Sequence, residues 1–377
     1  MTTLIPPSSV LGMTERALVL LNPGPSCTSD RVRHAVERGD MCHREVEFTE
    51  VLWSIRNRLP GALNVPDHEA ILVTGSGTSA MEMAVISSVR EGKEILIVNN
   101  GVYGDRLKKI ATAHGIPATE VSGDWFTPID VDEVRTALAS NPNIDAIAAV
   151  HHETTTGMIN PIKELGELAA AAGVIFLMDS ISGTGIENQD LGDVNADIIC
   201  GSANKGLHGL PGMAFILVSA KAVERLYEVP VRSLYLNAAT YLDGQRKGDV
   251  PFTPAVQICF AFDEAIKEFI EAGGFEARAK LYRERATVVR AGFEKLGLQM
   301  PVAPAHRSNT VNMLSLPDGV TYPELHDELK KRGYVIYAGQ GKLAQSYFRI
   351  CTMGEISFET LDELLVDLEE SIELLQR

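Results

Sequence analysis

A polar, glycine-rich loop at residues 202–212, SANKGLHGLPG, holds one lysine, Lys205, directly after an apolar run that predicts a buried strand. An isolated lysine is usually a solvated surface charge. At the end of a strand, however, burial and neighbouring groups can lower the pKa of the ammonium, and the amine becomes a nucleophile toward carbonyl groups. Lys205 is therefore a candidate for covalent chemistry, and the residues expected around it indicate whether it has that role.

A carboxylate follows a second apolar run, VIFLM at 174–178, which ends in Asp179, 26 positions before Lys205. Strands of α/β sheets direct their carboxyl ends toward the crevice where ligands bind. A carboxylate there could keep the ring nitrogen of pyridoxal phosphate protonated, which makes that cofactor an electron sink. An isolated Asp-Ser pair serves equally well as a helix or turn cap.

The third motif is GSGTSA at 75–80, between a predicted strand and a predicted helix. Small residues let the backbone close around a phosphate, and the helix N-terminus supplies N–H donors and a positive dipole end. The motif lacks the spacing of a dinucleotide site and the Lys-Ser/Thr ending of a P-loop. Together with Tyr103 and the hydroxyls of 154–156, these motifs follow successive strands in the order that a pyridoxal-phosphate site requires.

The elements that must position these residues alternate along the chain, and strands followed by helices predict a mostly parallel sheet covered by helices. The predicted strands are Ala70–Thr74, Glu94–Asn99, Ile144–His151, Val174–Asp179, Ala196–Cys200 and Met213–Val218. The predicted helices between them include Ser79–Arg90, Gly104–His114 and Ile162–Ala172.

The pattern changes near residue 263, where a charged amphipathic stretch, Phe275–Leu296, leads into an α+β segment. Its predicted strands are Thr310–Leu314, Tyr334–Tyr337 and Tyr347–Cys351, and a final amphipathic helix is predicted at Phe358–Leu375. We therefore expect an N-terminal arm at 1–15, a large α/β domain at 16–270 and a small C-terminal α+β domain at 271–377.

Composition narrows the functional classes. The 377 residues are 45% hydrophobic and 22% charged, as in ordinary globular proteins, and the formal net charge of −16 argues against nucleic acid or an anionic membrane as a partner. The five cysteines are scattered, odd in number and without a C-x-x-C pair, so neither a disulfide framework nor a metal site is expected. With no signal-like start and no run of eighteen apolar residues, we expect a cytoplasmic protein.

These motifs resemble the class V branch of the fold-type I aminotransferases, which includes alanine:glyoxylate, serine:pyruvate and 2-aminoethylphosphonate:pyruvate aminotransferases. The resemblance runs from LNPGPS at 21–26 to FRI at 348–350, nearly the whole chain. It implies a fold-type I transferase with pyridoxal 5'-phosphate held as a Schiff base on Lys205. Asp179 and Lys205 are the implied catalytic residues.

The resemblance also implies the other site residues. Cofactor contacts are implied for Ser76, Gly77, Thr78, Tyr103, Thr154, Thr156, Asp179, Ser202, Lys205 and Thr253. Tyr103 would stack on the ring, and Thr154, with Thr156 as the second choice, would lie near the ring hydroxyl. Thr253 lies in a segment that reaches the phosphate of a second subunit, which implies a homodimer with shared active sites. Substrate contacts are implied for Arg349, which grips the substrate's acid group, and for Gly24. Cys42, His43 and Arg44 are two-way candidates: they lie near the substrate and add a second cation for a dianionic phosphonate, or they have a structural role at the dimer interface.

Within the family, HETTTGM at 152–158, SANK at 202–205 and the run 341–350 resemble the 2-aminoethylphosphonate branch, whereas DMCHREVEF at 40–48 is closer to its relatives. We expect an aminotransferase of phosphonate metabolism that uses a small anionic amino donor and a 2-keto acid acceptor such as pyruvate. The alternatives are an alanine:glyoxylate or serine:pyruvate aminotransferase, or a lyase acting on a hydroxylated aminophosphonate. Cysteine desulfuration would require a mobile loop cysteine, and Cys351 falls on a predicted strand. In a binding protein without catalysis, no common function would explain why Lys205 and Asp179 occur together.

Overall fold

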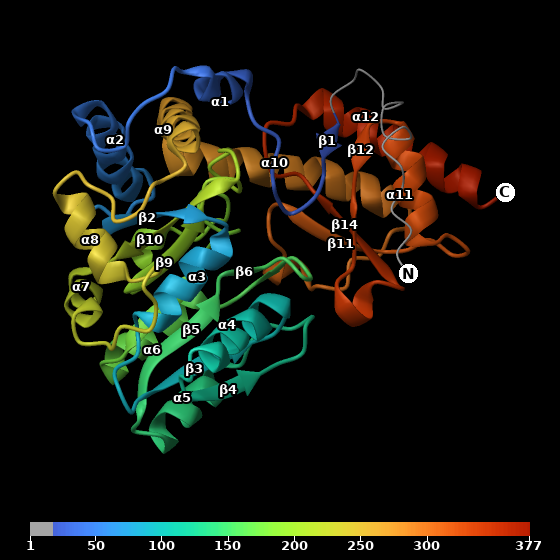
Figure 1. The fold of residues 1–377 in the computed structure, drawn as a ribbon. Coiled ribbons are helices and arrows are strands. Elements are labelled where there is room, and N and C mark those ends of the chain that lie inside the picture. Colours follow the sequence, from blue (N-terminus) through green and yellow to red (C-terminus); the bar gives the residue numbers. More distant parts are fainter. Residues whose placement is uncertain (1–17) are drawn as a thin grey trace, which may run out of the picture.

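The computed structural model describes residues 18–377, and its centre is a seven-stranded sheet (Figure 1). The strand order is β2-β10-β9-β8-β5-β3-β4, and only β10 runs antiparallel to its neighbours. The strands are β2 (Glu69–Gly75), β3 (Glu94–Asn99), β4 (Ala118–Ser122), β5 (Ile144–Val150), β8 (Ile175–Asp179), β9 (Ile198–Ser202) and β10 (Gly212–Val218). The predicted mostly parallel α/β sheet is confirmed.

Helices cover both faces of this sheet, so its central strands are buried throughout. Along β5, Ile147 and Ala149 contribute to one hydrophobic cluster, while Ala148 and Val150 contribute to the other, as the two-residue period of a strand requires. One face is covered by α2 (Val46–Ala62), α5 (Val131–Ser140), α6 (Ile162–Ala172) and α9 (Val256–Glu271). The other is covered by α3 (Gly77–Ile86), α4 (Val102–Ala113), α7 (Ala220–Leu226) and α8 (Ala238–Arg246).

All six strands predicted for the large domain are present, with ends that differ by at most two residues. The strand β4 was not predicted, because it is a sheet edge with partly exposed residues and lacks an apolar run. The predicted helix Ser79–Arg90 is shifted: α3 begins at Gly77 and ends at Ile86, so the phosphate-loop motif itself forms the first helical turn.

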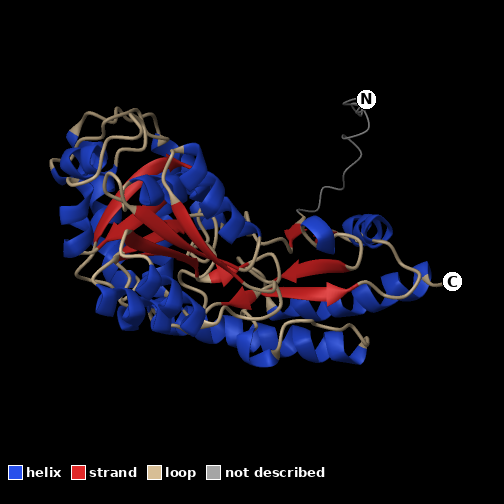
Figure 2. Cartoon of the chain, turned by 90° about the horizontal axis from the view of Figure 1, so that it is seen from below, coloured by secondary structure: helices blue, strands red, loops and turns tan. Residues whose placement is uncertain are grey.

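The C-terminal part forms a second group of strands and helices (Figure 2). An antiparallel sheet contains β11 (Val311–Ser315), β14 (Tyr347–Cys351) and β13 (Tyr337–Ala338). Its helices are α10 (Gly274–Lys295), α11 (Tyr322–Lys331) and α12 (Phe358–Leu375), the last with the bounds expected from its leucine spacing.

The prediction of a single strand at Tyr334–Tyr337 in this part is wrong. The run Tyr334–Tyr337 divides into β12 (Tyr334–Val335), which pairs with β1 (Val19–Leu20), and β13, which pairs with β14. The chain changes partners at the fully buried Ile336, so one apolar run serves two sheets.

The predicted division at residue 270 stays a prediction, and the predicted arm at 1–15 lies outside the described residues. The pairing of β1 with β12 places the chain around Val19 beside the C-terminal strands, and Leu21 packs in the core of that part. Among residues 18–377, no helix combines the length and apolar character needed to span a membrane.

Candidate active site

The carboxyl ends of several strands surround a cavity of about 490 Å³. It is lined by Ser76, Gly77, Thr78, Tyr103, Arg106, Ile181, Ser202, Asn204, Lys205, Pro211 and Gly212. The predicted phosphate loop, ring-stacking tyrosine and cofactor lysine, which are up to 129 residues apart in sequence, therefore share one cavity.

Lys205 enters the cavity from the loop after β9, and the N-terminal segment covers it. Its Nζ donates a hydrogen bond to the carbonyl of Pro23. Gly24 has φ +119°, and a Cβ there would lie 2.5 Å from the lysine Nζ, so only glycine allows this close approach. Burial lowers the pKa of Lys205 to about 8, which leaves a much larger share of free amine near neutral pH than an exposed lysine has.

Asp179 ends β8, and this residue is 3% exposed. One carboxyl oxygen accepts a hydrogen bond from the amide of Ile181 at 3.0 Å. Burial raises the pKa of Asp179 to about 6. A buried carboxyl with a raised pKa is strongly stabilised in its charged form by a protonated ring nitrogen, as the predicted role requires.

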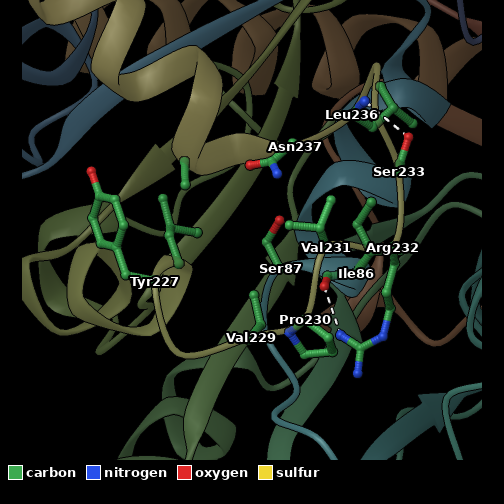
Figure 3. A pocket seen from close by; sticks show the side chains of 12 residues that line it. Ile86, Ser87, Tyr227, Val229, Pro230, Val231, Arg232, Ser233, Leu236 and Asn237 are labelled. Atoms are coloured by element: carbon green, nitrogen blue, oxygen red, sulfur yellow. Dashed lines mark hydrogen bonds between the residues drawn. The ribbon is translucent and has the colours of Figure 1, made fainter.

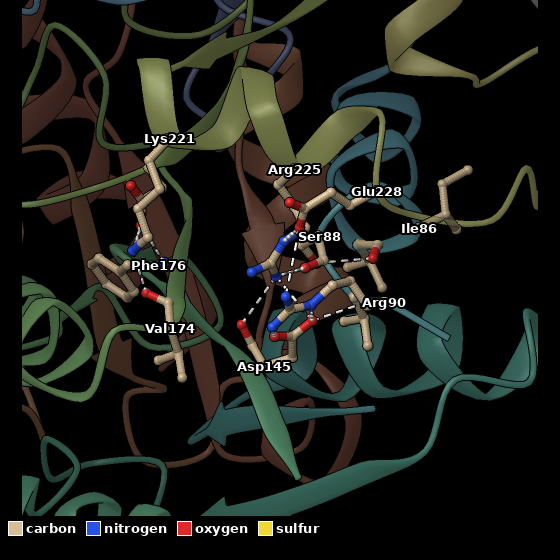
Figure 4. Close-up of polar contacts among 12 residues, drawn as sticks. Ile86, Ser88, Arg90, Asp145, Val174, Phe176, Lys221, Arg225 and Glu228 are labelled. Carbon is tan, nitrogen blue, oxygen red and sulfur yellow. Dashed lines mark hydrogen bonds and ion pairs between the residues drawn. The ribbon is translucent and has the colours of Figure 1, made fainter. Parts of the chain in front are cut away.

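A second buried aspartate provides a contrast at the opposite end of the sheet. Asp145 lies near the start of β5 and forms ion pairs with Arg90 at 2.7 Å and Arg225 at 2.9 Å (Figure 4). Burial alone would raise the pKa of Asp145, but the hydrogen bonds and charges of these arginines outweigh it, and the pKa is lowered. Asp145 is thus satisfied within the protein, whereas Asp179 has no such ion pair among the described residues.

The predicted phosphate loop forms the start of α3. Ser76 is the N-cap residue in an extended conformation, and its side chain makes no capping hydrogen bond to the helix. A Cβ at Gly77 would lie 2.9 Å from Ile181 Cδ1, so the loop is packed too closely for a larger residue. Backbone donors and the hydroxyls of Ser76 and Thr78 are thereby presented to the cavity.

A buried carboxylate, Glu153 in β6 (His152–Glu153), joins two segments of the predicted site. It accepts hydrogen bonds from the amides of Tyr103 and Thr155, each at 3.0 Å. A Cβ at Gly101 would lie 2.3 Å from the Glu153 carboxyl carbon, which accounts for the glycine of the Asn-Gly-x-aromatic motif. Glu153 therefore fixes the turn that carries Tyr103 against the chain that carries the threonines.

The two candidate threonines face different surroundings. Their hydroxyls, on Thr154 and Thr156, are both buried without a hydrogen-bond partner among residues 18–377. Thr156 lines a separate small cavity with Val311 and Met313, against the C-terminal part. The carbonyl of Thr154 accepts a hydrogen bond from Arg349, so Thr154 lies beside the guanidinium that is predicted to bind the substrate. An unpartnered buried hydroxyl at Thr154 fits a site that receives a polar group.

Arg349 lies on β14 and is 3% exposed. Its Nε donates to the carbonyl of Ala338 at 3.0 Å, and its Nη1 donates to the carbonyl of Thr154 at 2.9 Å. These bonds fix the plane of the guanidinium, and none of the described residues accepts a hydrogen bond from Nη2. A fixed guanidinium with a remaining donor suits the paired oxygens of an anionic substrate.

The residues that line this cavity do not include five of the predicted site residues described above, Gly24, Thr154, Thr156, Asp179 and Arg349. They also do not include three further predicted site residues, Thr253, His43 and Arg44. Thr253 is exposed, and Arg44 forms an exposed ion pair with Asp249 at 3.8 Å. His43 has a buried Nε2 without a partner among the described residues. Their site roles stay predictions.

Sequence reasoning missed several lining residues, of which Arg106 is the most polar. One signal was present: Arg106 follows Tyr103 by three positions at the start of a helix, so the two share a face. Asn204 was also missed, and its side-chain oxygen accepts from the Ser202 hydroxyl at 2.5 Å.

A family model described as Aminotransferase class-V matches residues 28–356. The 2-aminoethylphosphonate–pyruvate transaminase of Syntrophobacter fumaroxidans is 33% identical over 93% of this chain and 95% of its own length. The enzyme of that name from Vibrio parahaemolyticus is 32% identical over 94% and 97%.

Among solved structures, the alanine–glyoxylate aminotransferase of a Nostoc species superimposes with a TM-score of 0.90 at 25% identity, covering 96% of this chain and 97% of that one. The aspartate aminotransferase of Thermus thermophilus gives a TM-score of 0.86, also at 25% identity, covering 94% and 99%. The chain belongs to the class-V aminotransferase family and is a pyridoxal-phosphate-dependent transaminase, as its motifs predicted.

Proposed function

We propose that this transaminase transfers the amino group of 2-aminoethylphosphonate to pyruvate. The observation that carries the reaction type is the buried Lys205 amine in one cavity with the phosphate loop, with Asp179 at the adjacent strand end. The substrate assignment is supported by the runs at 152–158 and 202–205 and by the names of the relatives.

Each residue has a distinct part in this proposal. Bound pyridoxal phosphate supplies an aldehyde and an electron-accepting ring. Asp179 holds a proton on the ring nitrogen, and Thr154 hydrogen-bonds near the ring hydroxyl. Lys205 would hold the cofactor covalently, and its Nζ, when free, would take the proton from the amino-bearing carbon of the substrate. Arg349 binds the phosphonate of the donor and then the carboxylate of pyruvate, since both present paired oxygens.

The test supplies 2-aminoethylphosphonate, alanine or serine separately as donor, with pyruvate or glyoxylate as acceptor. We expect alanine and 2-phosphonoacetaldehyde, the aldehyde left after amino transfer, from the phosphonate and pyruvate. Turnover of alanine or serine with glyoxylate but not of the phosphonate would reassign the substrate to the alanine:glyoxylate type. Release of ammonia from a hydroxylated aminophosphonate, without an acceptor, would indicate the lyase alternative.

Cysteine desulfuration is opposed by the structure around Cys351. This thiol is fully buried on β14, and burial raises its pKa to about 11. A buried thiol held in a strand is a poor nucleophile near neutral pH.

Replacing Asp179 with asparagine should leave the cofactor bound while slowing proton removal from the substrate. Asparagine cannot keep the ring nitrogen protonated, so the electron sink is weaker, and we expect a fall in the proton-transfer rate of about 10²-fold or more. The measurement is the single-turnover rate with normal and α-deuterated donor, together with the bound cofactor. An unchanged rate and isotope effect would contradict the assignment. The matched variant Asp145→Asn, at the other end of the sheet, should affect stability rather than this step.

The proposed enzyme is a homodimer that shares its active sites. An apolar segment is exposed beside Thr253: Val231 is 75% exposed, Leu234 81% and Tyr235 41%, and the Tyr235 ring lies 5.1 Å from that of Phe252. Figure 3 shows Val231 among the side chains that line a pocket in this segment. Such an apolar patch suits a second copy of the chain.

Subunit complementation tests this arrangement. Thr253→Glu should repel the cofactor phosphate of the partner, and Lys205→Ala should disable its own site. Random mixing of the two variants places both changes in one site of each hybrid, so about a quarter of wild-type activity should return. No recovery from a demonstrably mixed dimer, or a fully active monomer, would refute shared sites.

A further inference from the structure

Arg106 occupies a position between the predicted ring-stacking residue and the predicted phosphate loop. Its Nη1 donates a hydrogen bond to the Thr78 hydroxyl oxygen at 3.2 Å. Its guanidinium carbon lies 4.6 Å from the centroid of the Tyr103 ring, within the range of a cation–π contact. Both partners line the Lys205 cavity with it, and these two contacts fix the guanidinium there.

Arg106 forms no direct ion pair among the described residues, although its positive charge favours the ionised form of Asp179. By contrast, Arg90 and Arg225 on the same molecule are paired with Asp145. Apart from Lys205, Arg106 is the only Lys or Arg among the residues lining this cavity. A fixed, unpaired cation in a cavity of a protein with net charge −16 points to an anionic ligand.

The contact with Thr78 indicates which anion this is. A hydroxyl that accepts a hydrogen bond from a guanidinium keeps its own proton free to donate. Thr78 lies in the first turn of α3, so its O–H is available to a ligand beside the backbone donors of the predicted phosphate loop. The loop supplies neutral donors and the positive end of a helix dipole. Since Lys205 is assigned to the covalent linkage, Arg106 is the remaining lining residue that can give a dianionic phosphate a full positive charge.

We propose that Arg106 is the cation of the cofactor-phosphate subsite, binding the phosphate directly together with Thr78. This inference rests on the proposed use of pyridoxal phosphate and adds a ligand to that site. Arg106 acts on cofactor affinity and orientation, while Lys205 remains available for the covalent linkage and Arg349 for the substrate.

The experiment compares two cofactor forms that differ only in the phosphate. Apoprotein is titrated with pyridoxal phosphate and with pyridoxal, and the lysine-linked fraction is measured by absorbance and by borohydride trapping. Losing a charge-assisted contact should weaken pyridoxal phosphate binding by Arg106→Gln by about 30-fold. Binding of pyridoxal should stay within about 3-fold. Arg106→Lys, which keeps the charge but not the planar fork, should fall between.

Lys109→Gln is the matched control, because it removes one positive charge from an exposed position of the same helix. It should leave both affinities unchanged. Equal losses for both cofactor forms in Arg106→Gln and Arg106→Lys would show that Arg106 only supports Tyr103, and the proposal would be overturned. Unchanged binding of pyridoxal phosphate in Arg106→Gln would overturn it as well. Wild-type protein that binds neither form would instead refute the use of pyridoxal phosphate, and this inference with it.

Discussion

Replacement of Lys205 with alanine is expected to abolish the covalent cofactor linkage and to lower turnover by at least about 10³-fold, since one amine serves as both nucleophile and proton carrier. The fold should survive, because alanine shortens a side chain at a cavity wall and the surrounding strands are unchanged. Pyridoxal phosphate should still bind non-covalently through the phosphate loop. Borohydride should then fail to fix the cofactor to the protein.

The control for this variant is Lys163→Ala, at an exposed position on α6, which should retain the linkage and the activity. A Lys205→Ala protein with the wild-type absorbance band and normal turnover would refute the assignment of the lysine. Added small amines should restore part of the proton transfer in Lys205→Ala. Such rescue would separate the loss of the amine from a loss of folding.

Replacement of Arg349 should impair both half-reactions while the cofactor stays bound. Removal of a charge-assisted contact that orients a substrate anion should weaken transition-state binding by on the order of 2 to 5 kcal/mol. Arg349→Lys keeps the positive charge, yet it should still lose most activity. A lysine cannot donate to the carbonyls of Ala338 and Thr154 while also presenting a planar fork to the substrate.

The measurement is kcat/KM for 2-aminoethylphosphonate and for pyruvate in Arg349→Lys and Arg349→Gln, with cofactor affinity measured separately. Arg283→Lys provides the conservative control, because the Arg283 side chain donates a hydrogen bond to Asn188 and forms no ion pair among the described residues. Near wild-type kcat/KM for both substrates in Arg349→Lys would contradict a bidentate role. A loss of cofactor binding in parallel would indicate that Arg349 supports the site rather than the substrate.

Much of the site could be predicted from sequence because its residues follow strand ends. In a parallel sheet the carboxyl ends of neighbouring strands meet at one edge, so the order of Ser76, Asp179 and Lys205 along the chain already places them together. The glycine-rich turn before α3 and the buried runs before Asp179 and Lys205 are local signals. Local periodicity likewise predicted α6, β14 and α12 with the bounds observed.

Only the tertiary structure determined what contacts these residues across long sequence separations. Lys205 is covered by Pro23 and Gly24, and Pro23 lies 182 positions earlier in the chain. Arg349 is fixed by a hydrogen bond to Thr154, which is 195 positions away. No spacing rule encodes such contacts, because they depend on how the C-terminal part packs against the sheet. The same packing splits the apolar run at 334–337 between two sheets.

The electrostatic character of the site is also a tertiary property. Asp145 and Asp179 are both buried aspartates on neighbouring strands, and sequence offers no measure of their pKa values. The pKa of Asp145 is lowered because Arg90 and Arg225 fold against it, whereas that of Asp179 is raised because it is buried without such an ion pair. Sequence therefore determined which residue types reach the ends of the strands. Packing decided which of their charged groups are ion-paired within the protein and which are unpaired and can interact with a ligand.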